Sequence, residues 1–518
     1  MTKMLSTVAV LLAGTMLVSA APAFAAQGSV EQADPSEPDA SDATADAAIA
    51  AAQPTDDSQS KIELLQAQVE ALQSALEDIQ KGMAKVTPSW KGAPVIEDKE
   101  AGFSFKPRGA IQADAGYVGF PDGKERRGTV GGLNYQNLGW NSRFRRLLFG
   151  ADGTLPGGFR YSAEFNFAQG SIDYEDIFIA YDFQKLPLTV QVGNIYPFSS
   201  LETMTSSKFT SMMERASITD AFNYNRRLGV GLTFSDKKAD SWLFQAGLFN
   251  EPVNNGNFTR TGWQASMRGV YMPLLGTTRL HLGANFQHRQ NTRENLVAQY
   301  RTRPLTQITD QRFVDTGNLA AKGDDVAGLE FAAIRKGIHL AGEAQKVWVR
   351  GTYDAADIAA IVAQTDSNQA FPANAVPLNG NPGFWGGYAE IGYYFTGETR
   401  GYKGGKFDRT KVLKPFNEGG MGAIQLNGRV DYVKLSDRVD GSSTAVAAPF
   451  YVNGGKQLGY QASLIWNPTD YVRFMAQYGR LDVTGGPRAA TVDPTSLRPV
   501  SKRNYNVDTF AVRAQIDF

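Results

Sequence analysis

Residues 159–168 read FRYSAEFNFA, and the apolar side chains fall on every second position. The odd positions from 159 to 167 hold only aromatic residues and alanine, while Ser162, Glu164 and Asn166 stand between them. Successive side chains of a β-strand point to opposite faces of the sheet, so this stretch predicts a strand with one apolar and one polar face. The preceding residues, LPGG (155–158), have the composition of a tight turn.

The same alternation recurs along most of the chain after Phe103. It is clearest in residues 422–433, 471–480 and 507–518, where aliphatic or aromatic residues alternate with charged or amide side chains. A soluble sandwich would cover its apolar faces with a second sheet, whereas a membrane barrel turns them outward to lipid. Because lipid offers no partner to an unpaired strand edge, such a sheet must close on itself. The sequence therefore predicts an all-β transmembrane barrel over residues 100–518.

The connections between these segments are short and long in turn, as in bacterial outer-membrane barrels. Short turns are expected at residues 155–158, 184–187, 274–277 and 467–470, and long loops near 195–226, 288–325, 351–382 and 484–505. We expect 16 antiparallel strands, beginning near residues 105, 142, 159, 174, 188, 227, 241, 261, 279, 326, 338, 384, 422, 455, 471 and 507. The last strand ends in Phe518, which is typical of the signal read by the outer-membrane assembly machinery.

The N-terminus has the features of an export signal followed by a spacer. Residues 1–25 contain one lysine and a short apolar run, and they end in Ala-Phe-Ala, which predicts a secretory signal peptide. Residues 26–60 are rich in alanine, acidic residues, serine and proline, and they contain too few large apolar side chains to fold, so we expect a disordered acidic spacer. The signal peptide together with the predicted barrel indicates export to the bacterial outer membrane.

Residues 61–87 follow a heptad pattern, with apolar side chains spaced three and four residues apart in turn. We expect a coiled-coil helix that brings copies of the chain together, and a trimer is compatible with its mixed branching. Pro88 ends the helix. The alternative is an amphipathic helix lying on its own domain. The seam residues are Ile62, Leu65, Val69, Leu72, Leu76, Ile79, Met83 and Val86.

Charge and composition narrow the classes of function. The 52 basic and 52 acidic residues balance over the chain, which argues against nucleic-acid binding. Residues 1–86 hold four of the basic and twelve of the acidic residues, so residues 87–518 carry 48 basic against 40 acidic ones. The chain has no cysteine, and its three histidines show no metal-ligand spacing, so we expect no metal and no cofactor.

Residues 141–149, NSRFRRLLF, place Arg143, Arg145 and Arg146 among large apolar side chains. On a strand that ends at the turn 155–158, Arg146 faces the lumen. Strict alternation would point Arg145 at lipid, at a cost of about 2–4 kcal/mol, so we expect a β-bulge there or a position near the membrane interface. Inside the barrel these arginines have two expected uses, which are attracting anions and bracing the wall. The acidic partners for bracing are Glu164, Asp176 and Asp182.

The long loop after the fifth strand is the second cationic region. Hydroxyl groups beside a lysine suit phosphate or carboxylate oxygens, so we expect this third loop to fold into the barrel and narrow it. The alternative is a solvated surface loop. With arginines on the polar faces of other strands, the candidate pore-lining residues are Arg143, Arg145, Arg146, Ser206, Ser207, Lys208, Arg215, Arg226, Arg227, Arg429 and Arg473.

Three motifs resemble the phosphate-selective porin O/P family. They are SRFRRLLFGADGTLPGGFRYSAEFNFA (142–168), TSSK…MERA…NRRLGVGL within residues 205–232, and NPTDYVRFMAQYGR (467–480). The resemblance extends over residues 61–518. It implies a trimeric, 16-stranded outer-membrane barrel that passes phosphate or polyphosphate through lumens lined by arginine and lysine.

The resemblance also assigns roles to individual residues. The family's arginine pair falls on Arg145 and Arg146, and its loop serine and lysine fall on Ser207 and Lys208. Arg226 and Arg227 match the basic start of the next strand. Leu148 departs from the pattern, because a polar residue is expected there in a phosphate-selective pore. That departure favours a general preference for anions over tight phosphate selectivity.

We therefore expect an outer-membrane porin that lets small anions, phosphate or polyphosphate among them, diffuse passively. The expected partners are two further copies of the chain in a homotrimer, the lipid bilayer and lipopolysaccharide, and small anionic solutes, with no nucleic acid. One alternative is a general or sugar-type porin, and another is a barrel with a mainly structural tethering role. An enzyme is not expected, because no nucleophile motif accompanies His281 and His288.

Overall fold

The computed structural model describes residues 56–85, 89–90, 92–124, 137–250, 253, 262–293, 295–364, 371–440, 443–492 and 495–518. The signal peptide expected over residues 1–25, and the acidic spacer up to residue 55, lie outside the described residues. Helix α2 (Asp56–Lys85) covers residues 61–85 of the predicted heptad segment 61–87, and the described part of its seam is exposed, with Leu72 69% accessible. The side chains of the last three seam positions, Ile79, Met83 and Val86, lie outside the described part.

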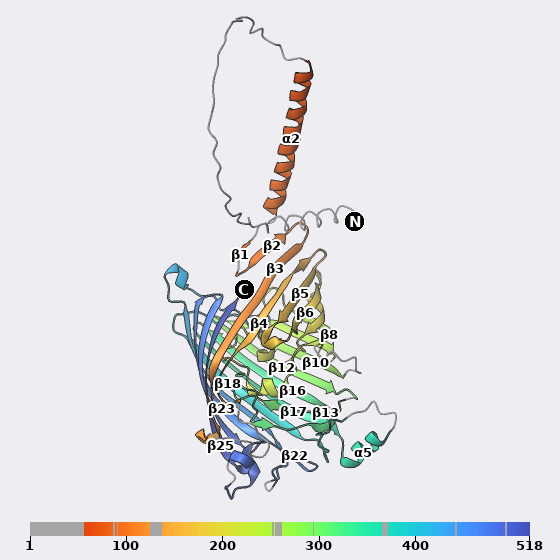
Figure 1. The fold of residues 1–518 in the computed structure, drawn as a ribbon, viewed down its shortest axis with the longest axis vertical. Helices are drawn as coiled ribbons and strands as arrows, with labels where there is room; N and C mark the ends of the chain where they lie inside the picture. Colours follow the sequence, from red (N-terminus) through yellow and green to blue (C-terminus); the bar gives the residue numbers. More distant parts are fainter. Residues whose placement is uncertain are drawn as a thin grey trace, which may run out of the picture. The chain divides into compact units, whose positions relative to one another are not determined.

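Sixteen long antiparallel strands form a closed barrel, as predicted (Figure 1). Each strand pairs with its neighbours in chain order, and the last pairs with the first, so that Phe510 lies opposite Tyr117. The strands are β3 (Phe103–Val118), β4 (Gly139–Leu155), β5 (Phe159–Asn166), β6 (Asp173–Asp182), β7 (Leu188–Ile195), β8 (Arg227–Ser235), β9 (Trp242–Phe249), β10 (Trp263–Tyr271), β12 (Thr278–Gln290), β16 (Leu319–Arg335), β17 (Ile338–Thr352), β18 (Gly383–Tyr394), β21 (Ala423–Asp437), β23 (Tyr451–Thr469), β24 (Val472–Thr484) and β25 (Asn504–Asp517).

Most strands begin close to the predicted residue, and the clearest exception is β16. It begins at Leu319 rather than near residue 326. The extra residues, LAAKGDD, do not alternate in polarity, but their backbone pairs with β17, and Ala321 lies opposite Thr352. A backbone hydrogen-bond ladder leaves no trace in side-chain polarity, so alternation alone could not show this extension.

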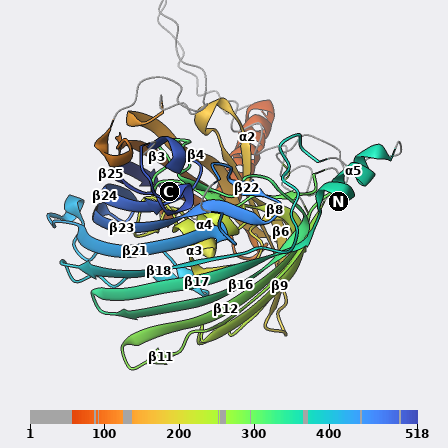
Figure 2. The same cartoon turned by 90° about the horizontal axis from the view of Figure 1, so that it is seen from below.

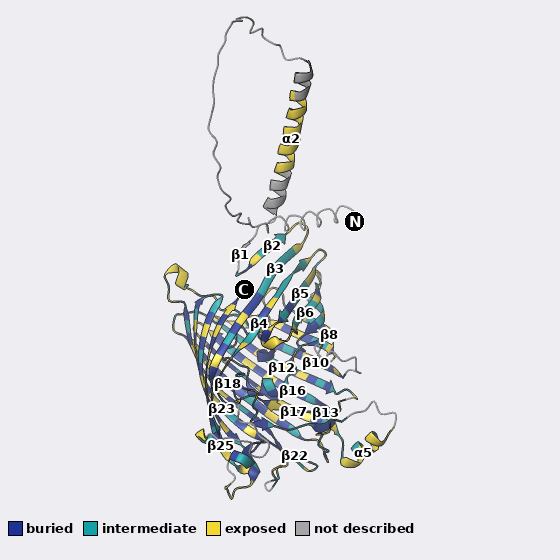
Figure 3. Ribbon diagram, in the orientation of Figure 1, coloured by how far each residue is buried: buried dark blue, intermediate teal, exposed yellow. Residues whose placement is uncertain are grey.

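The two faces of the barrel wall differ in polarity as expected. Outward residues such as Phe149, Ile179 and Leu329 are 59%, 56% and 66% exposed. Inward residues are polar and buried, and Arg268 and Glu330 form an ion pair there at 2.7 Å. Figure 3 shows buried and exposed residues in turn along the strands. Apolar side chains facing lipid and polar side chains facing the lumen are the arrangement of an outer-membrane barrel.

Among the described residues, the connections at one end of the barrel are short with one departure, and most of those at the other end are long. The turn after β4 uses Gly157 and Gly158 at φ of +88° and +91°, which residues with a side chain rarely adopt. The departure is the connection of residues 395–422 between β18 and β21, which lies at the short-turn end. It carries a small hairpin made of β19 (Tyr402–Lys403) and β20 (Lys406–Phe407), which we did not predict.

Two connections from the long-loop end of the barrel fold into it. Residues 196–226, here called loop L3, contain α3 (Leu201–Met204) and α4 (Ser217–Phe222), and Figure 2 shows both helices inside the ring of strands. Residues 291–318, here called loop L5, contain β13 (Val297–Ala298), β14 (Arg301–Thr302) and β15 (Val314–Asp315).

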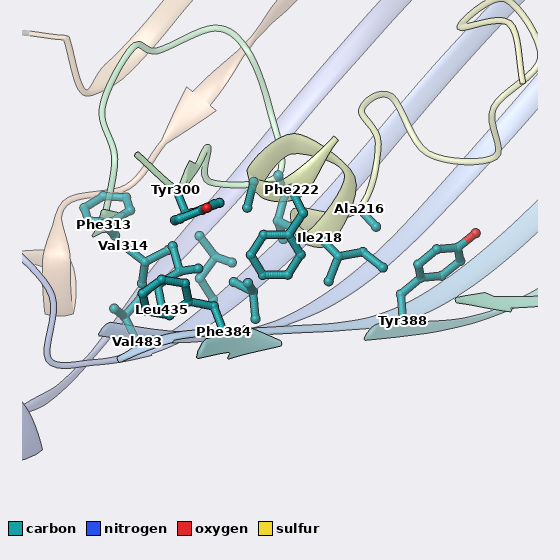
Figure 4. Close-up of a cluster of buried hydrophobic side chains, with 14 of the residues drawn as sticks. Ala216, Ile218, Phe222, Tyr300, Phe313, Val314, Phe384, Tyr388, Leu435 and Val483 are labelled. Atoms are coloured by element: carbon teal, nitrogen blue, oxygen red, sulfur yellow. The ribbon is translucent and has the colours of Figure 1, made fainter. Parts of the chain in front are cut away.

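An apolar cluster joins these two loops to the wall of the barrel (Figure 4). Ile218 and Phe222 of α4 pack with Tyr300 of L5 and with Phe384 of β18, and all four side chains are at most 2% exposed. The alternating pattern predicts a polar lumen throughout, and this part of the lumen is instead a small hydrophobic core. Burial of these apolar side chains stabilises the position of both loops inside the barrel.

The remaining elements are short. None of the helices in the described residues combines the length and the apolar character that crossing a membrane would require. The remaining short elements are β1 (Ser89–Trp90), β2 (Pro94–Asp98), β11 (Leu274–Leu275), β22 (Ala447–Ala448), α5 (Ala355–Ala363) and α6 (Ala489–Val492), with single 3-10 turns at Pro121–Gly123, Ala168–Gly170, Phe416–Glu418 and Val500–Lys502.

Candidate anion-binding site

A β-bulge at Arg145 turns all three arginines of β4 toward the lumen. Gln112 of β3 lies opposite Arg146, and the next residue, Ala113, lies opposite Phe144, so Arg145 is an extra residue without a partner in the ladder. Phe144 remains outside, 53% exposed. The bulge therefore removes the cost of a charge facing lipid, and it is one of the two arrangements that the sequence led us to expect.

Loop L3 is held by polar side chains that project from the barrel wall. A chain segment inside a lumen carries many backbone carbonyls that need hydrogen-bond donors. The inward faces of β23, β24 and β25 supply these donors, so the polar alternation of the strands also serves the loop. Arg473 donates to the carbonyls of Lys208 (2.8 Å) and Thr210 (2.5 Å), Ser463 to that of Ser211 (2.6 Å), and Arg513 to that of Met213 (2.6 Å).

Glu202 is the centre of a second anchor, at α3. One carboxylate oxygen accepts a hydrogen bond from the backbone N–H of Ala216 at 2.7 Å, which joins the two helices of L3. The other oxygen accepts from Arg429 of β21 at 2.6 Å, and Arg429 also pairs with Glu390 at 2.6 Å. The charge of Arg429 is thus matched by two carboxylates, and this predicted pore-lining residue braces the loop against the wall.

Between L3, L5 and strands β4 to β6 lies a polar cavity of about 520 Å³. Its lining contains six arginines and four carboxylates, so basic groups exceed acidic ones by two. The arginines are Arg143, Arg145, Arg146, Arg215, Arg226 and Arg303, and the carboxylates are those of Asp173, Glu175, Glu214 and Asp220. Five of these arginines are among the predicted pore-lining residues, and the fold brings them together from two separate stretches of sequence.

Three of the six arginines are paired with carboxylates. Arg145 forms a two-pronged ion pair with Glu214, with distances of 2.8 and 3.1 Å. Burial alone would raise the pKa of Glu214, but Arg145 and Arg513 hold it well below its usual range, so this carboxylate stays charged. Arg226 pairs with Asp176 at 2.6 Å and with Glu175. Arg303 of L5 pairs with Asp220 of α4 at 3.4 Å.

The other three arginines have only neutral oxygens as partners among the described residues. Arg143 donates to the carbonyl of Gln307 at 2.6 Å, and its buried Nε has no hydrogen-bond partner there. Arg146 donates to the side-chain oxygen of Gln112 at 3.1 Å. Arg215 donates to backbone carbonyls of α3 and its C-cap, such as that of Glu202 at 3.0 Å. A guanidinium carries five N–H donors, so each keeps charge and donors for a further acceptor.

The acids expected to brace Arg143, Arg145 and Arg146 are paired with other residues, which corrects that part of the sequence interpretation. This is why the positive charge of β4 is only partly cancelled. Glu164 pairs with Arg108 at 2.9 Å, Asp176 with Arg226 at 2.6 Å, and Asp182 with Arg160.

The loop serines and Lys208 do not line this cavity. The Lys208 ammonium lies 3.8 Å from Glu164, and burial lowers its pKa. The Ser207 carbonyl accepts from Gln112 at 3.3 Å, and the Ser206 hydroxyl accepts from the backbone of Lys208 at 3.4 Å. The two serines thus shape the loop.

Arg227 and Arg473, the remaining predicted residues, also lie outside the cavity lining. The guanidinium of Arg227 lies over the ring of Tyr224, 3.9 Å from its centre, and donates to the carbonyl of Asn250 at 3.1 Å. Arg473 supports the backbone of L3 through the two hydrogen bonds described above.

Sequence reasoning missed three contributors to the lumen. Tyr196 lies directly after β7 and contacts two arginines, and Arg303 and Gln307 enter the cavity from L5. A local pattern carries no sign of contacts between two loops that are about 100 residues apart. The connection 395–422 was also missed, although its length was a usable signal, because the other turns at that end are short.

This connection reaches the lumen from the short-turn end. Arg400 donates to the carbonyl of Phe209 in L3 at 3.0 Å, and the backbone of Phe407 donates to the hydroxyl of Thr205 at 3.2 Å. Arg268 of β10 donates to the carbonyl of Gly405 at 2.8 Å. The hairpin therefore contacts L3 and the wall of the barrel at the same time.

Comparison with known proteins agrees with this architecture. The family described as phosphate-selective porin O and P matches residues 125–518. An uncharacterized protein of Caulobacter vibrioides is 34% identical over 440 residues, which cover 83% of this chain and 77% of that protein. Porin O of Pseudomonas aeruginosa is 26% identical over 419 residues, covering 75% of this chain and 85% of Porin O.

Among solved structures, an anion-selective porin from Comamonas acidovorans aligns with a TM-score of 0.42 and 10% identity, covering 80% of this chain and all of that one. The match of the family to residues 125–518 takes in fifteen of the sixteen strands and the whole arginine cavity. The chain belongs to the phosphate-selective porin O and P family, and it is an outer-membrane porin.

Proposed function

We propose that this porin lets small oxyanions, with phosphate and polyphosphate among them, diffuse passively across the bacterial outer membrane. The observation that carries the proposal is the trio of Arg143, Arg146 and Arg215, which share one cavity and have no carboxylate within ion-pair distance among the described residues. Guanidinium groups bind oxyanions through charge and through several hydrogen bonds at once. Low-dielectric walls strengthen that field at the constriction.

Loops L3 and L5 and the connection 395–422 would narrow the path, so that a solute passes close to these arginines. A second candidate is a general porin without phosphate selectivity. The four carboxylates in the cavity lining favour it, because they would repel a highly charged polyphosphate. Leu148 also favours a general porin, because its side chain offers no hydrogen-bond donor to an anion.

Conductance of the purified protein in planar bilayers tests the proposal. In a gradient of potassium chloride we expect a reversal potential of the sign that marks anion preference. Added phosphate should reduce the chloride current at concentrations well below that of chloride, because it competes for the arginines with more hydrogen bonds. Cation preference would rule out the anion channel. Anion preference without any phosphate block would leave the general porin.

We also propose that the protein is a homotrimer in a bilayer with lipopolysaccharide, exported by residues 1–25, and that helix α2 contributes a coiled coil to the trimer. The exposed seam supports the coiled coil, since Ile62, Leu65 and Leu72 are 51%, 59% and 69% accessible. Apolar side chains at heptad spacing are stable in water when partner helices cover them.

Charged residues in the seam should weaken the trimer. We expect the double variant L65D/L72D to lower the temperature at which the detergent-solubilised trimer dissociates. The matched control is A67D/S74D, which adds the same charges midway between successive seam positions, on the helix face opposite the seam. Light scattering after chromatography at rising temperature measures the assembly. Equal dissociation temperatures for the two double variants would contradict a coiled coil.

A further inference from the structure

A row of three lysines and one tryptophan crosses the outer face of the barrel wall. Lys346 of β17 lies opposite Trp385 of β18. Trp385 in turn lies opposite Lys434 of β21, which lies opposite Lys456 of β23. Figure 2 shows these four strands side by side. Val433, the neighbour of Lys434, packs in the apolar cluster inside the barrel, so the alternation of the strands turns this outer lysine row away from the lumen.

The three ammonium groups of the outer lysine row have no carboxylate within ion-pair distance among the described residues. Lys434 and Lys456 stand directly opposite each other, and like charges in that relation destabilise a sheet. An arrangement that costs stability on its own favours a ligand that brings negative charge. Two outward carboxylates beside the row already pair with arginines, Asp325 with Arg350 at 3.0 Å and Asp482 with Arg480 at 3.6 Å.

The outer lysine row lies close to the long-loop end of the barrel, which faces the outside of the cell in outer-membrane barrels. Trp385 stands near Gly383, the first residue of β18, and Lys434 stands near Asp437, the last residue of β21. Trp348 and Trp385 are 41% and 48% exposed, and such aromatic side chains form the girdle at the membrane interface. The row is therefore at the level of the head groups of the outer leaflet.

Toward the short-turn end, the same strands carry an apolar groove of about 580 Å³ on their outer face. Gly428 of β21 lies opposite Ala462 of β23, and these two small residues leave a depression in the surface. Val430 and Tyr460, which also lie opposite each other, border it and are 47% and 46% exposed. Along β21, Val430 is about 13 Å from Lys434, so the groove lies deeper in the membrane than the row.

We propose that this face of the barrel binds the lipid A part of lipopolysaccharide, with its phosphates on the outer lysine row and an acyl chain in the groove. The inference rests on the proposed placement of the protein in a bilayer with lipopolysaccharide. Lipid A carries a phosphate at each end of a disaccharide, and ammonium groups form charge-assisted hydrogen bonds with phosphate. Lys346 and Lys456 are three strand spacings apart, about 14 Å, which suits two phosphates better than the single phosphate of a phospholipid head group.

Titration of the purified, delipidated protein in detergent with bisphosphorylated lipid A tests the proposal, and native mass spectrometry measures the bound fraction. We expect K346Q/K434Q/K456Q to raise the dissociation constant by at least about tenfold, because charge-assisted hydrogen bonds to the phosphates are lost. The matched control should bind like the wild type. It is K185Q/K238Q/K336Q, which removes three exposed lysines from the short turns at the other end of the barrel.

The variant G428L tests the groove without changing any charge. A side chain at Gly428 enters open space, since a Cβ there would have only the Cγ2 of Ile391 within 4 Å, at 3.9 Å. Leucine should fill the groove and weaken the binding of acylated lipid A. Lipid A from which the acyl chains have been removed should bind to the wild type and to G428L equally.

Each other outcome has a definite meaning. Equal lipid A affinity in the wild type and in either K346Q/K434Q/K456Q or G428L would overturn the site. If phosphatidylglycerol binds as tightly as lipid A and loses as much affinity in the triple variant, the ligand is a phospholipid and the assignment to lipopolysaccharide is wrong. If the triple variant instead lowers the dissociation temperature of the lipid-free assembly, the face is a contact between copies of the chain.

The reversal potential in potassium chloride separates this inference from the proposed channel function. The outer lysine row faces away from the lumen, so the three lysine variants should keep the anion preference of the wild type. Cation preference in the wild type would refute the anion channel and leave the lipid site standing. A wild type that binds no lipid A would refute the lipid site and leave the channel function standing.

Discussion

Replacing Arg143, Arg146 and Arg215 together by glutamine should reverse the charge preference of the channel from anions to cations. The three arginines that remain in the cavity lining would face four carboxylates, so the local excess of charge changes sign. A unit charge about 6 Å from a permeating ion contributes about 3 kcal/mol at an effective dielectric constant of 20. We therefore expect the permeability ratio of chloride to potassium to fall by more than about tenfold. Reversal potentials in a potassium chloride gradient measure the ratio directly.

The matched control for this variant is R498Q, which removes an exposed arginine from the long loop before β25, outside the cavity lining. It should leave the permeability ratio close to that of the wild type. Single-channel conductance should be retained in the triple variant, since glutamine keeps most of the side-chain volume. If the triple variant still prefers anions, the field that selects them comes from some other part of the lumen.

The second large effect is expected for Arg513→Ala, which should destabilise the barrel by about 3–5 kcal/mol. Arg513 is completely buried, and it joins β25, β3 and L3. It forms a two-pronged pair with Asp114 at 2.7 and 2.8 Å, and it contacts Glu214 at 2.8 Å. Removing it leaves the Asp114 charge buried without its cation, and Glu214 keeps only Arg145. Urea unfolding of the protein in detergent measures the loss.

Two further variants show whether that loss comes from the unpaired charge. R480A removes an exposed arginine that lies 3.6 Å from Asp482 and 3.5 Å from Asp508, and it should cost no more than about 1 kcal/mol. R513L/D114N removes both members of the buried pair and should be more stable than R513A, because no isolated charge remains. A single-channel conductance that rises in R513A would show that L3 has lost its tether. Equal losses for R513A and R480A would refute the assigned role.

The arginines of the lumen have two different roles. Arg513 and Arg429 are buried and matched by carboxylates, so they support the loop. Arg143 and Arg146 stand on the same inward face of the wall, yet their neighbours are a carbonyl and an amide. Whether a lumen arginine braces the wall or attracts solutes depends on which groups the loops bring opposite it.

The sequence by itself determined the strands, their number and the direction of their faces. Each strand of the wall faces lipid on one side and the aqueous lumen on the other. Apolar and polar side chains therefore alternate along its sequence with a period of two. The sequence also limited Arg145 to two arrangements, a bulge or a position near the membrane interface, because a charge facing lipid is costly, and the structure has the bulge. The motifs at residues 142–168, 205–232 and 467–480 pointed to the family that the family match confirms.

Only the tertiary structure decided which cations remain unpaired, because partners meet across long separations in sequence. Glu202 reaches Arg429 over 227 residues, and Gln307 reaches Arg143 over 164 residues. The hairpin in residues 395–422 and the apolar cluster around Phe222 could not be predicted from the sequence for the same reason. A loop inside the lumen is surrounded by other segments of the chain rather than by lipid on one side and water on the other. Its sequence therefore shows no regular alternation of polarity from which its contacts could be predicted.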